Sequence, residues 1–152
     1  MFPETIGRPM EILVVEDDRV QARLAWEAVN RGDFPHRTTL IGDGREALDF
    51  VLRRGMFRVA PRPDLVLLDL RLPGMDGLDV LAEIRSDESL KAIPVVIMTS
   101  SQDEQDRLSC QEHCVEAYLS KPVDLEKFLS LLRQLKQFWH EDMLLPPALA
   151  QT

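Results

Sequence analysis

The feature that most restricts the fold of this chain is a set of short, uninterrupted aliphatic runs. The clearest are residues 11–15 (apolar from Ile12 on), 65–68 and 95–98. A strand that is apolar at every position, rather than at alternate positions, has to be covered on both faces. Such strands are typical of parallel sheets, where a helix connects each strand to the next. The runs therefore predict a sheet buried between two layers of helices.

Segments with helical periodicity separate these runs. In the first segment, Val20, Leu24, Ala28 and Val29 share one helical stripe, and Gly32 is a stop signal. Four more helices are predicted. Three of them have apolar stripes, formed by Ala47, Leu48, Val51 and Leu52, by Leu78, Leu81 and Ile84, and by Leu125, Phe128, Leu129, Leu132 and Leu135. The fourth spans the segment 103–114. The basic segment 53–63 ends in two closely spaced prolines and predicts a loop.

Two weaker strand candidates, 37–41 and 117–119, complete five successive βα units. Short right-handed crossovers arrange such units as an open sheet with helices on both sides. We expect an α/β fold: a doubly wound five-stranded parallel sheet with five helices and the flavodoxin-like strand order 2-1-3-4-5.

Charge and hydropathy restrict the partners. Eighteen Lys and Arg against 26 Asp and Glu give a formal net charge of −8, which argues against nucleic-acid binding. No apolar run approaches the about 20 residues of a membrane span, and residues 1–9 lack the core of a signal peptide, so we expect no membrane partner and a cytoplasmic location. The 152 residues suit one domain at 10–139, between an N-terminal extension at 1–9 and a C-terminal tail at 140–152.

Polar residues stand at the carboxyl ends of four predicted strands. They are Glu16, Asp17 and Asp18 after the first, Asp69 at the end of the third, Thr99 at the end of the fourth and Lys121 after the fifth. One acid behind a strand is most often a helix cap. In an open parallel sheet, however, the carboxyl ends meet at one edge, where ligands bind. The pattern therefore predicts one polar pocket.

The chemistry of this set favours phosphoryl transfer. Clustered carboxylates repel one another unless a cation neutralises them, and carboxylate oxygens suit Mg²⁺. With Mg²⁺ bound, Asp69 could attack phosphorus, while Lys121 and the Thr99 hydroxyl stabilise phosphoryl oxygens.

Four motifs resemble those of bacterial response-regulator receiver domains, the chemotaxis-regulator type. They are Ile12-Leu13-Val14-Val15-Glu16-Asp17-Asp18, Leu67-Leu68-Asp69-Leu70-Arg71-Leu72-Pro73-Gly74-Met75-Asp76-Gly77, Met98-Thr99-Ser100 and Tyr118-Leu119-Ser120-Lys121-Pro122. They occur in the family's order and spacing, and the resemblance covers about residues 10–138.

The resemblance implies that Asp69 is the phosphoacceptor. It also implies that Glu16 and Asp17 form the acid pair of a Mg²⁺ site, completed by Asp69 and the backbone carbonyl of Arg71. We expect Asp18 to cap the first helix instead of binding metal.

The same resemblance assigns a switch. Thr99 and Tyr118 resemble the residue pair that moves inward on phosphorylation, and Lys121 resembles the family's lysine, with a cis bond before Pro122. The protein would then not be an enzyme with an external substrate. It would be a phosphoacceptor that promotes its own phosphorylation and dephosphorylation and signals through protein contacts.

A finer resemblance points to the phytochrome-associated single-domain regulators. It rests on Arg54-Gly55, on Ala60-Pro61-Arg62-Pro63-Asp64, on Ile93-Pro94 and on Phe138-Trp139. It implies a histidine kinase partner, a bacteriophytochrome, and a homodimer formed through the last helices and strand. Apolar residues beyond Gln137 agree with such an interface.

Two alternatives remain open. One is a protein-binding module that works without phosphotransfer, and the other is a phosphatase acting on small phosphate esters. Cys110, His113 and Cys114 have metal-like spacing, but we expect reduced cysteines beside a helical histidine.

Overall fold

The computed structural model describes residues 8–32, 34–100 and 115–135. Within them, one parallel sheet has the strand order β2-β1-β3-β4-β5. The strands are β1 (Met10–Val15), β2 (His36–Ile41), β3 (Leu65–Asp69), β4 (Val95–Thr99) and β5 (Ala117–Ser120). The predicted sheet and its strand order are confirmed.

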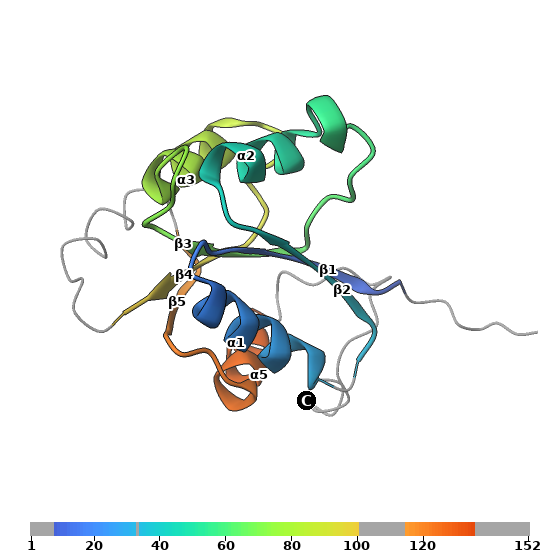
Figure 1. Ribbon diagram of the computed structural model, residues 1–152. Coiled ribbons are helices and arrows are strands. Elements are labelled where there is room, and N and C mark those ends of the chain that lie inside the picture. Colours follow the sequence, from blue (N-terminus) through green and yellow to red (C-terminus); the bar gives the residue numbers. More distant parts are fainter. Residues whose placement is uncertain (1–7, 33, 101–114, 136–152) are drawn as a thin grey trace, which may run out of the picture.

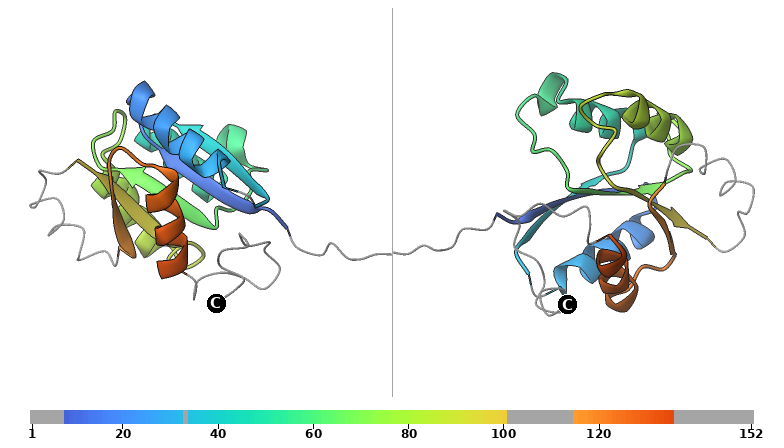
Figure 2. Two further views of the ribbon diagram at one scale, coloured as in Figure 1. Left: turned by 90° about the horizontal axis from the view of Figure 1, so that it is seen from below. Right: turned by 180° about the vertical axis from the view of Figure 1, so that it is seen from behind.

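Helices cover both faces of the sheet. Helices α1 (Arg19–Asn30) and α5 (Leu125–Gln134) lie on one face, and α2 (Gly44–Leu52) and α3 (Gly77–Ser86) lie on the other (Figure 1). The two further views in Figure 2 show the same three layers. The helix expected at 103–114 lies outside the described residues.

The strands supply both halves of the core. In β1, Ile12 and Val14 pack into the cluster under α1 and α5, whereas Leu13 and Val15 pack into the cluster under α2 and α3. All six residues of β1 and all five of β3 are buried. This two-sided burial is the reason for the uninterrupted aliphatic runs in the sequence.

Aspartates start three of the helices. Asp18 Oδ1 accepts hydrogen bonds from the backbone N–H groups of Val20 at 2.9 Å and Gln21 at 3.2 Å. Asp43 and Asp124 cap α2 and α5 in the same way. These bonds satisfy donors that the first turn of a helix leaves without partners, and the capping role expected of Asp18 is confirmed.

The predicted stripe of the first helix is partly wrong. Ala28 and Val29 are buried, but Val20 is 66% exposed and Leu24 is 37% exposed. Ala25 is buried in their place. The stripe that faces β1 is centred on the small residues, with Leu24 at its margin and Val20 beyond it, and isolated apolar side chains are tolerated at a surface.

The basic segment between α2 and β3 is a loop, as predicted, with one short turn of 3₁₀ helix, η1 (Gly55–Phe57). Phe57 makes an edge-on contact with Phe50 of α2, with ring centroids 5.4 Å apart. In the described part of the chain, none of the helices has the length and hydropathy of a transmembrane span.

Candidate functional site

Strand register brings the predicted polar residues to one edge of the sheet. Val15 of β1 pairs with Leu68 of β3, so Glu16 and Asp69 follow at equivalent positions. Asp69 pairs with Met98 of β4, and Thr99 pairs with Ser120 of β5, directly before Lys121. Parallel strands thus deliver residues from four parts of the chain to one place.

Three carboxylates form a compact cluster there. Glu16, Asp17 and Asp69 each present an oxygen, and these oxygens lie within 4.8 Å of one another. Glu16 and Asp69 are buried, whereas Asp17 is exposed. The Glu16 carboxylate also accepts a 3.0 Å hydrogen bond from the backbone N–H of Asp18, which fixes its orientation. The cluster is therefore anchored on the protein side and open on the solvent side.

Lys121 lies between two of these carboxylates. Its Nζ is 2.5 Å from Glu16 Oε1 and 3.4 Å from Asp69 Oδ1. The lysine side chain is 15% exposed and that of Glu16 is 1% exposed. In this partly dry setting, an ion pair is worth more than at a free surface.

Burial and charge shift two pKa values at the site. Burial raises the pKa of Glu16, although hydrogen bonds from Lys121 and from the Asp18 backbone oppose that shift. Burial alone would lower the pKa of Lys121, but its hydrogen bond to Glu16 and the charges of Asp69 and Glu16 outweigh this effect and raise it. The ammonium group thus stays charged while it neutralises its neighbours.

The loop after Asp69 packs closely against its surroundings. The Arg71 backbone N–H points to Asp69 Oδ1 at 3.4 Å, and the Gly77 N–H donates to the carbonyl of Leu70 at 2.9 Å. A Cβ atom at Gly77 would lie 2.5 Å from Leu70 Cα, and one at Gly44 would collide with the carbonyl of Met75. Two glycines therefore allow α2 and α3 to approach the loop that carries the predicted metal-ligand carbonyl of Arg71.

Sequence reasoning did not identify these two glycines as part of the site. Short glycine-containing motifs usually mark turns, so they are not a signal for a functional site. The only available signal was their position next to predicted helix starts, and that signal does not reveal which backbone lies opposite.

The remaining predicted site residues lie nearby. Thr99 is the last residue of β4. Tyr118 in β5 packs, partly buried, against the cluster under α2 and α3. The peptide bond between Lys121 and Pro122 is cis, as expected.

The carboxylate cluster fits a divalent metal ion. Its donors are hard oxygens, and the closeness of three negative charges favours a cation of charge two. Lys121 alone cannot balance three carboxylates. Cys110, His113 and Cys114, the other metal-like set in the sequence, lie outside the described residues.

Fold and site together define a class of protein. A parallel sheet of order 2-1-3-4-5, with an acidic cluster and one lysine at its carboxyl edge, is the architecture of a two-component receiver. The chain matches the family of the response regulator receiver domain over residues 12–133 and belongs to it.

Relatives in this family include phytochrome response regulators. The response regulator Rcp1 of Synechocystis sp. is 39% identical over 140 residues, which cover 92% of this chain and 95% of Rcp1. The crystal structure of the Mn²⁺-bound form of Rcp1 superposes with a TM-score of 0.73, at 38% identity over 91% of this chain and 99% of that one.

Two other solved structures are similar. The bacteriophytochrome response regulator RtBRR has a TM-score of 0.78 and 38% identity, covering 94% of this chain and 87% of its own. The phosphorylated cyanobacterial phytochrome response regulator RcpA has a TM-score of 0.74 and 38% identity, covering 86% and 94%. The resemblance to the phytochrome-associated regulators is thus confirmed.

Proposed function

We propose that Asp69 is the phosphoacceptor of this response regulator and that a histidine kinase is the donor. The observation that carries the proposal is the position of Asp69, which shares its edge of the sheet with two other carboxylates and lies 3.4 Å from the ammonium group of Lys121. This arrangement keeps a carboxylate nucleophile beside a charge that attracts phosphoryl oxygens.

In the proposed transfer, a carboxylate oxygen of Asp69 forms a bond to phosphorus. The bond between phosphorus and the donor's imidazole nitrogen breaks, and its electron pair remains on that nitrogen. Lys121 and the Thr99 hydroxyl stabilise the negative charge on the transferred group. Most of the catalysis is then positioning and charge stabilisation. The protein promotes its own phosphorylation and later hydrolysis, without acting as an enzyme on an external substrate.

We assign Mg²⁺ to the acidic cluster, with Glu16, Asp17, Asp69 and the backbone carbonyl of Arg71 as its protein partners. When bound, the ion neutralises the carboxylates and the phosphoryl oxygens. The donor set supports a hard divalent ion, and the Mn²⁺-bound form of Rcp1 is a related case. Mg²⁺ keeps several waters and needs few protein ligands, which suits a cluster with one exposed member, Asp17.

The output of the switch is a change of surface. Thr99 and Tyr118 stand on neighbouring strands, and their inward movement would alter the face next to β5 and α5. The signal then passes through protein contacts.

We further propose that the kinase is a bacteriophytochrome, that the protein is cytoplasmic, and that it is a homodimer formed through the last helices and strand. The names of RtBRR and RcpA support the proposal that the kinase is a bacteriophytochrome.

In this proposal the receiver domain occupies 10–139, with an extension at 1–9 and a tail at 140–152. Truncation after Gln137 should leave a monomer by light scattering, and an unchanged dimer would contradict the interface.

The test is intact mass after incubation with acetyl phosphate and Mg²⁺. Wild type should gain one phosphoryl group, which borohydride reduction should map to position 69. Asp69→Asn should gain none, and Asp76→Asn, a neighbouring acid outside the cluster, should behave as wild type. If wild type gains nothing from acetyl phosphate or from a bacteriophytochrome kinase, the chain is better described as a binding module independent of phosphotransfer. Multiple turnover of a phosphate ester would instead favour a phosphatase.

A further inference from the structure

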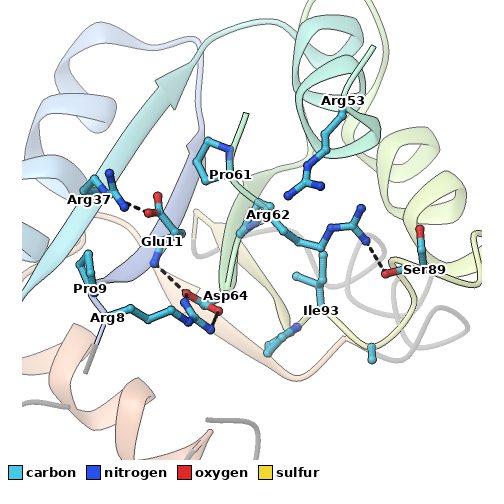
Figure 3. Close-up of a pocket in the computed structure, with 13 residues that line it drawn as sticks. Arg8, Pro9, Glu11, Arg37, Arg53, Pro61, Arg62, Asp64, Ser89 and Ile93 are labelled. Atoms are coloured by element: carbon cyan, nitrogen blue, oxygen red, sulfur yellow. Dashed lines mark hydrogen bonds and ion pairs between the residues drawn. The ribbon is translucent and has the colours of Figure 1, made fainter. Parts of the chain in front are cut away.

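A pocket of about 730 Å³ opens at the opposite edge of the sheet, where β1, β3 and β4 begin. Figure 3 shows its lining, which comes from the start of β1, from β2, from the loop before β3 and from the segment before β4. A volume of this size is in the range of small-molecule sites. No residue of the acidic cluster lines it.

Arginines dominate the polar lining. Arg8, Arg37, Arg53 and Arg62 face two carboxylates, Glu11 and Asp64, in a chain whose formal net charge is −8. The pocket is therefore a local excess of positive charge on an acidic protein.

Two of the arginines neutralise the two carboxylates. Arg8 donates to both oxygens of the buried Asp64, at 2.7 and 2.9 Å, and Asp64 also accepts from the Glu11 backbone N–H at 2.8 Å. Arg37 Nε lies 2.8 Å from Glu11 Oε2. These pairs lie together on one side of the pocket (Figure 3).

The other two arginines lie on the opposite side and are held by neutral groups. Arg53 Nε donates to the carbonyl of Ala60 at 2.9 Å, and Arg62 Nη1 donates to the carbonyl of Ser89 at 2.7 Å. Neither forms an ion pair with a carboxylate in the described segments. A backbone carbonyl orients a guanidinium group without cancelling its charge, so the remaining N–H groups are available for an anion.

One acid outside the pocket, Asp87, interacts electrostatically with Arg62. The pKa of Asp87 is lowered, chiefly by its hydrogen bonds with Ser89 and to a smaller extent by the charge of Arg62. Asp87 is half-buried and does not line the pocket, so it offsets the charge of Arg62 only in part and leaves that of Arg53 unchanged.

The backbone of Arg53 is a second, independent observation. Arg53 ends α2 in the left-handed conformation, with φ 57° and ψ 48°, a place where glycine is usual. A non-glycine residue in this region is strained, and such strain concentrates at functional positions. A glycine at position 53 would remove the backbone strain, but it would also remove the guanidinium group.

Apolar and rigid groups form the rest of the lining. Pro9, Pro61, Pro63, Ile93 and Pro94 contribute most of it. Prolines restrict the backbone, so this part of the lining loses little conformational freedom when a ligand binds.

We propose that this pocket binds a small molecule that has an apolar body and one carboxylate or phosphate group, and that Arg53 and Arg62 hold the anionic group. Arginine forks match both planar carboxylates and phosphates. The site is independent of the proposed phosphorylation of Asp69, since it lies at the other end of the strands.

The experiment uses the full chain, labelled with ¹⁵N and free of Mg²⁺, with phenyl phosphate, benzoate and neutral benzamide as probes. We expect saturable shifts of the Arg53 and Arg62 Nε–Hε signals and of the Leu65 and Ser89 amides. Saturation with phenyl phosphate alone identifies a phosphate ligand, and saturation with benzoate alone identifies a carboxylate ligand. Benzamide should shift none of these signals.

Variants make the assignment specific. Arg53→Gln/Arg62→Gln should weaken binding by about tenfold or more, because it removes charge-assisted hydrogen bonds. Arg58→Gln, an exposed arginine of the same loop that does not line the pocket, should bind as wild type. The amide spectrum of each variant reports its fold. No saturation with either anion at about 20 mM, equal binding of benzamide, or unchanged binding by the double variant would each overturn the proposal.

Discussion

Lys121 has a central position in the acidic site, and this position affects both metal binding and the proposed phosphorylation. Its ammonium group touches the carboxylate that is least exposed and the carboxylate that we propose to be modified. A lysine in this place offsets part of the negative charge of the cluster and offers a cation to the proposed phosphoryl group, but it also competes with any metal ion for the oxygens of Glu16. These two effects have opposite consequences for metal binding and for phosphorylation.

Replacement of the lysine should separate the two effects. We expect Lys121→Met to bind Mg²⁺ several-fold more tightly, since a competing cation is gone, and to accept a phosphoryl group from acetyl phosphate much more slowly. Calorimetry measures the first quantity and intact mass the second. Lys91→Met, which removes only an exposed pair with Glu88, is the control. Weaker Mg²⁺ binding by Lys121→Met would contradict the competition.

The raised pKa of Lys121 predicts a pH dependence of stability. A lysine whose folded-state pKa exceeds its ordinary 10.5 stabilises the folded state fully below that value, and this contribution is lost as the pH rises through the folded-state pKa. In the metal-free protein, the difference in free energy of unfolding between wild type and Lys121→Met should shrink above about pH 10.5. Urea titrations across that range measure it, and a constant difference would show that the ion pair does not shift the lysine.

Individual residues differ in how well the sequence predicts them. Glu16, Asp17, Asp69 and Lys121 were expected together because all follow strands of one parallel sheet, and the structure brings them together. The pairing of Lys121 with Glu16, which is closer than its pairing with Asp69, was not expected. It depends on side-chain burial, which strand order does not specify.

At the scale of elements, the start of α3 determines how the loop after Asp69 lies. Gly77→Ala would place a methyl group against the backbone of Asp69 and Leu70. We expect a loss of about 2 kcal/mol in the free energy of unfolding, together with slower phosphorylation. Gly42→Ala is the matched control, because its methyl group would meet only ordinary contacts, the nearest at 3.5 Å. Equal stability of the two variants in urea would show that the loop can move away.

Arg85 connects the end of α3 with the beginnings of β4 and β5. Its guanidinium donates to the carbonyl of Ile93 at 2.9 Å and to Glu116 at 2.8 Å, and Glu116 accepts the Val95 N–H at 2.7 Å. Arg85→Met leaves the largely buried Glu116 without its cation and should lower the free energy of unfolding by about 3 kcal/mol. Arg85→Met/Glu116→Gln should recover part of this loss in the same urea assay, and no recovery would mean that the arginine acts mainly on backbone carbonyls.

Helices and strands could be predicted from the sequence where an apolar run or a capping residue marks them. The strand at 65–69 was predicted correctly because every residue in it is buried. The first helix was placed correctly, but its buried face was predicted only in part. Ala28 and Val29 are buried as expected, whereas Ala25 takes the place of the larger Val20 and Leu24. Residue size alone does not indicate which side of a helix a sheet will cover.

At the scale of the whole molecule, a metal ion bound to the acidic cluster should stabilise the folded state, because it relieves the repulsion between the carboxylates. A ligand that binds only the folded state at 100 times its Kd stabilises it by about 2.7 kcal/mol. Saturating Mg²⁺ should raise Tm, and EDTA should reverse the change. Asp17→Asn should lose most of the shift, whereas Asp18→Asn should keep it, since asparagine also caps α1 and position 18 is outside the cluster. An equal shift in both variants would place the ion elsewhere.

The strands β1, β3 and β4 run from the arginine-lined pocket to the edge that holds the acids. Four arginines and two carboxylates line one end, and three carboxylates with one lysine form the other. These two groups of charges together contribute an electric dipole that is directed along the strands. At low ionic strength, such a contribution favours encounters in which a cation approaches the acidic edge and an anion approaches the arginines.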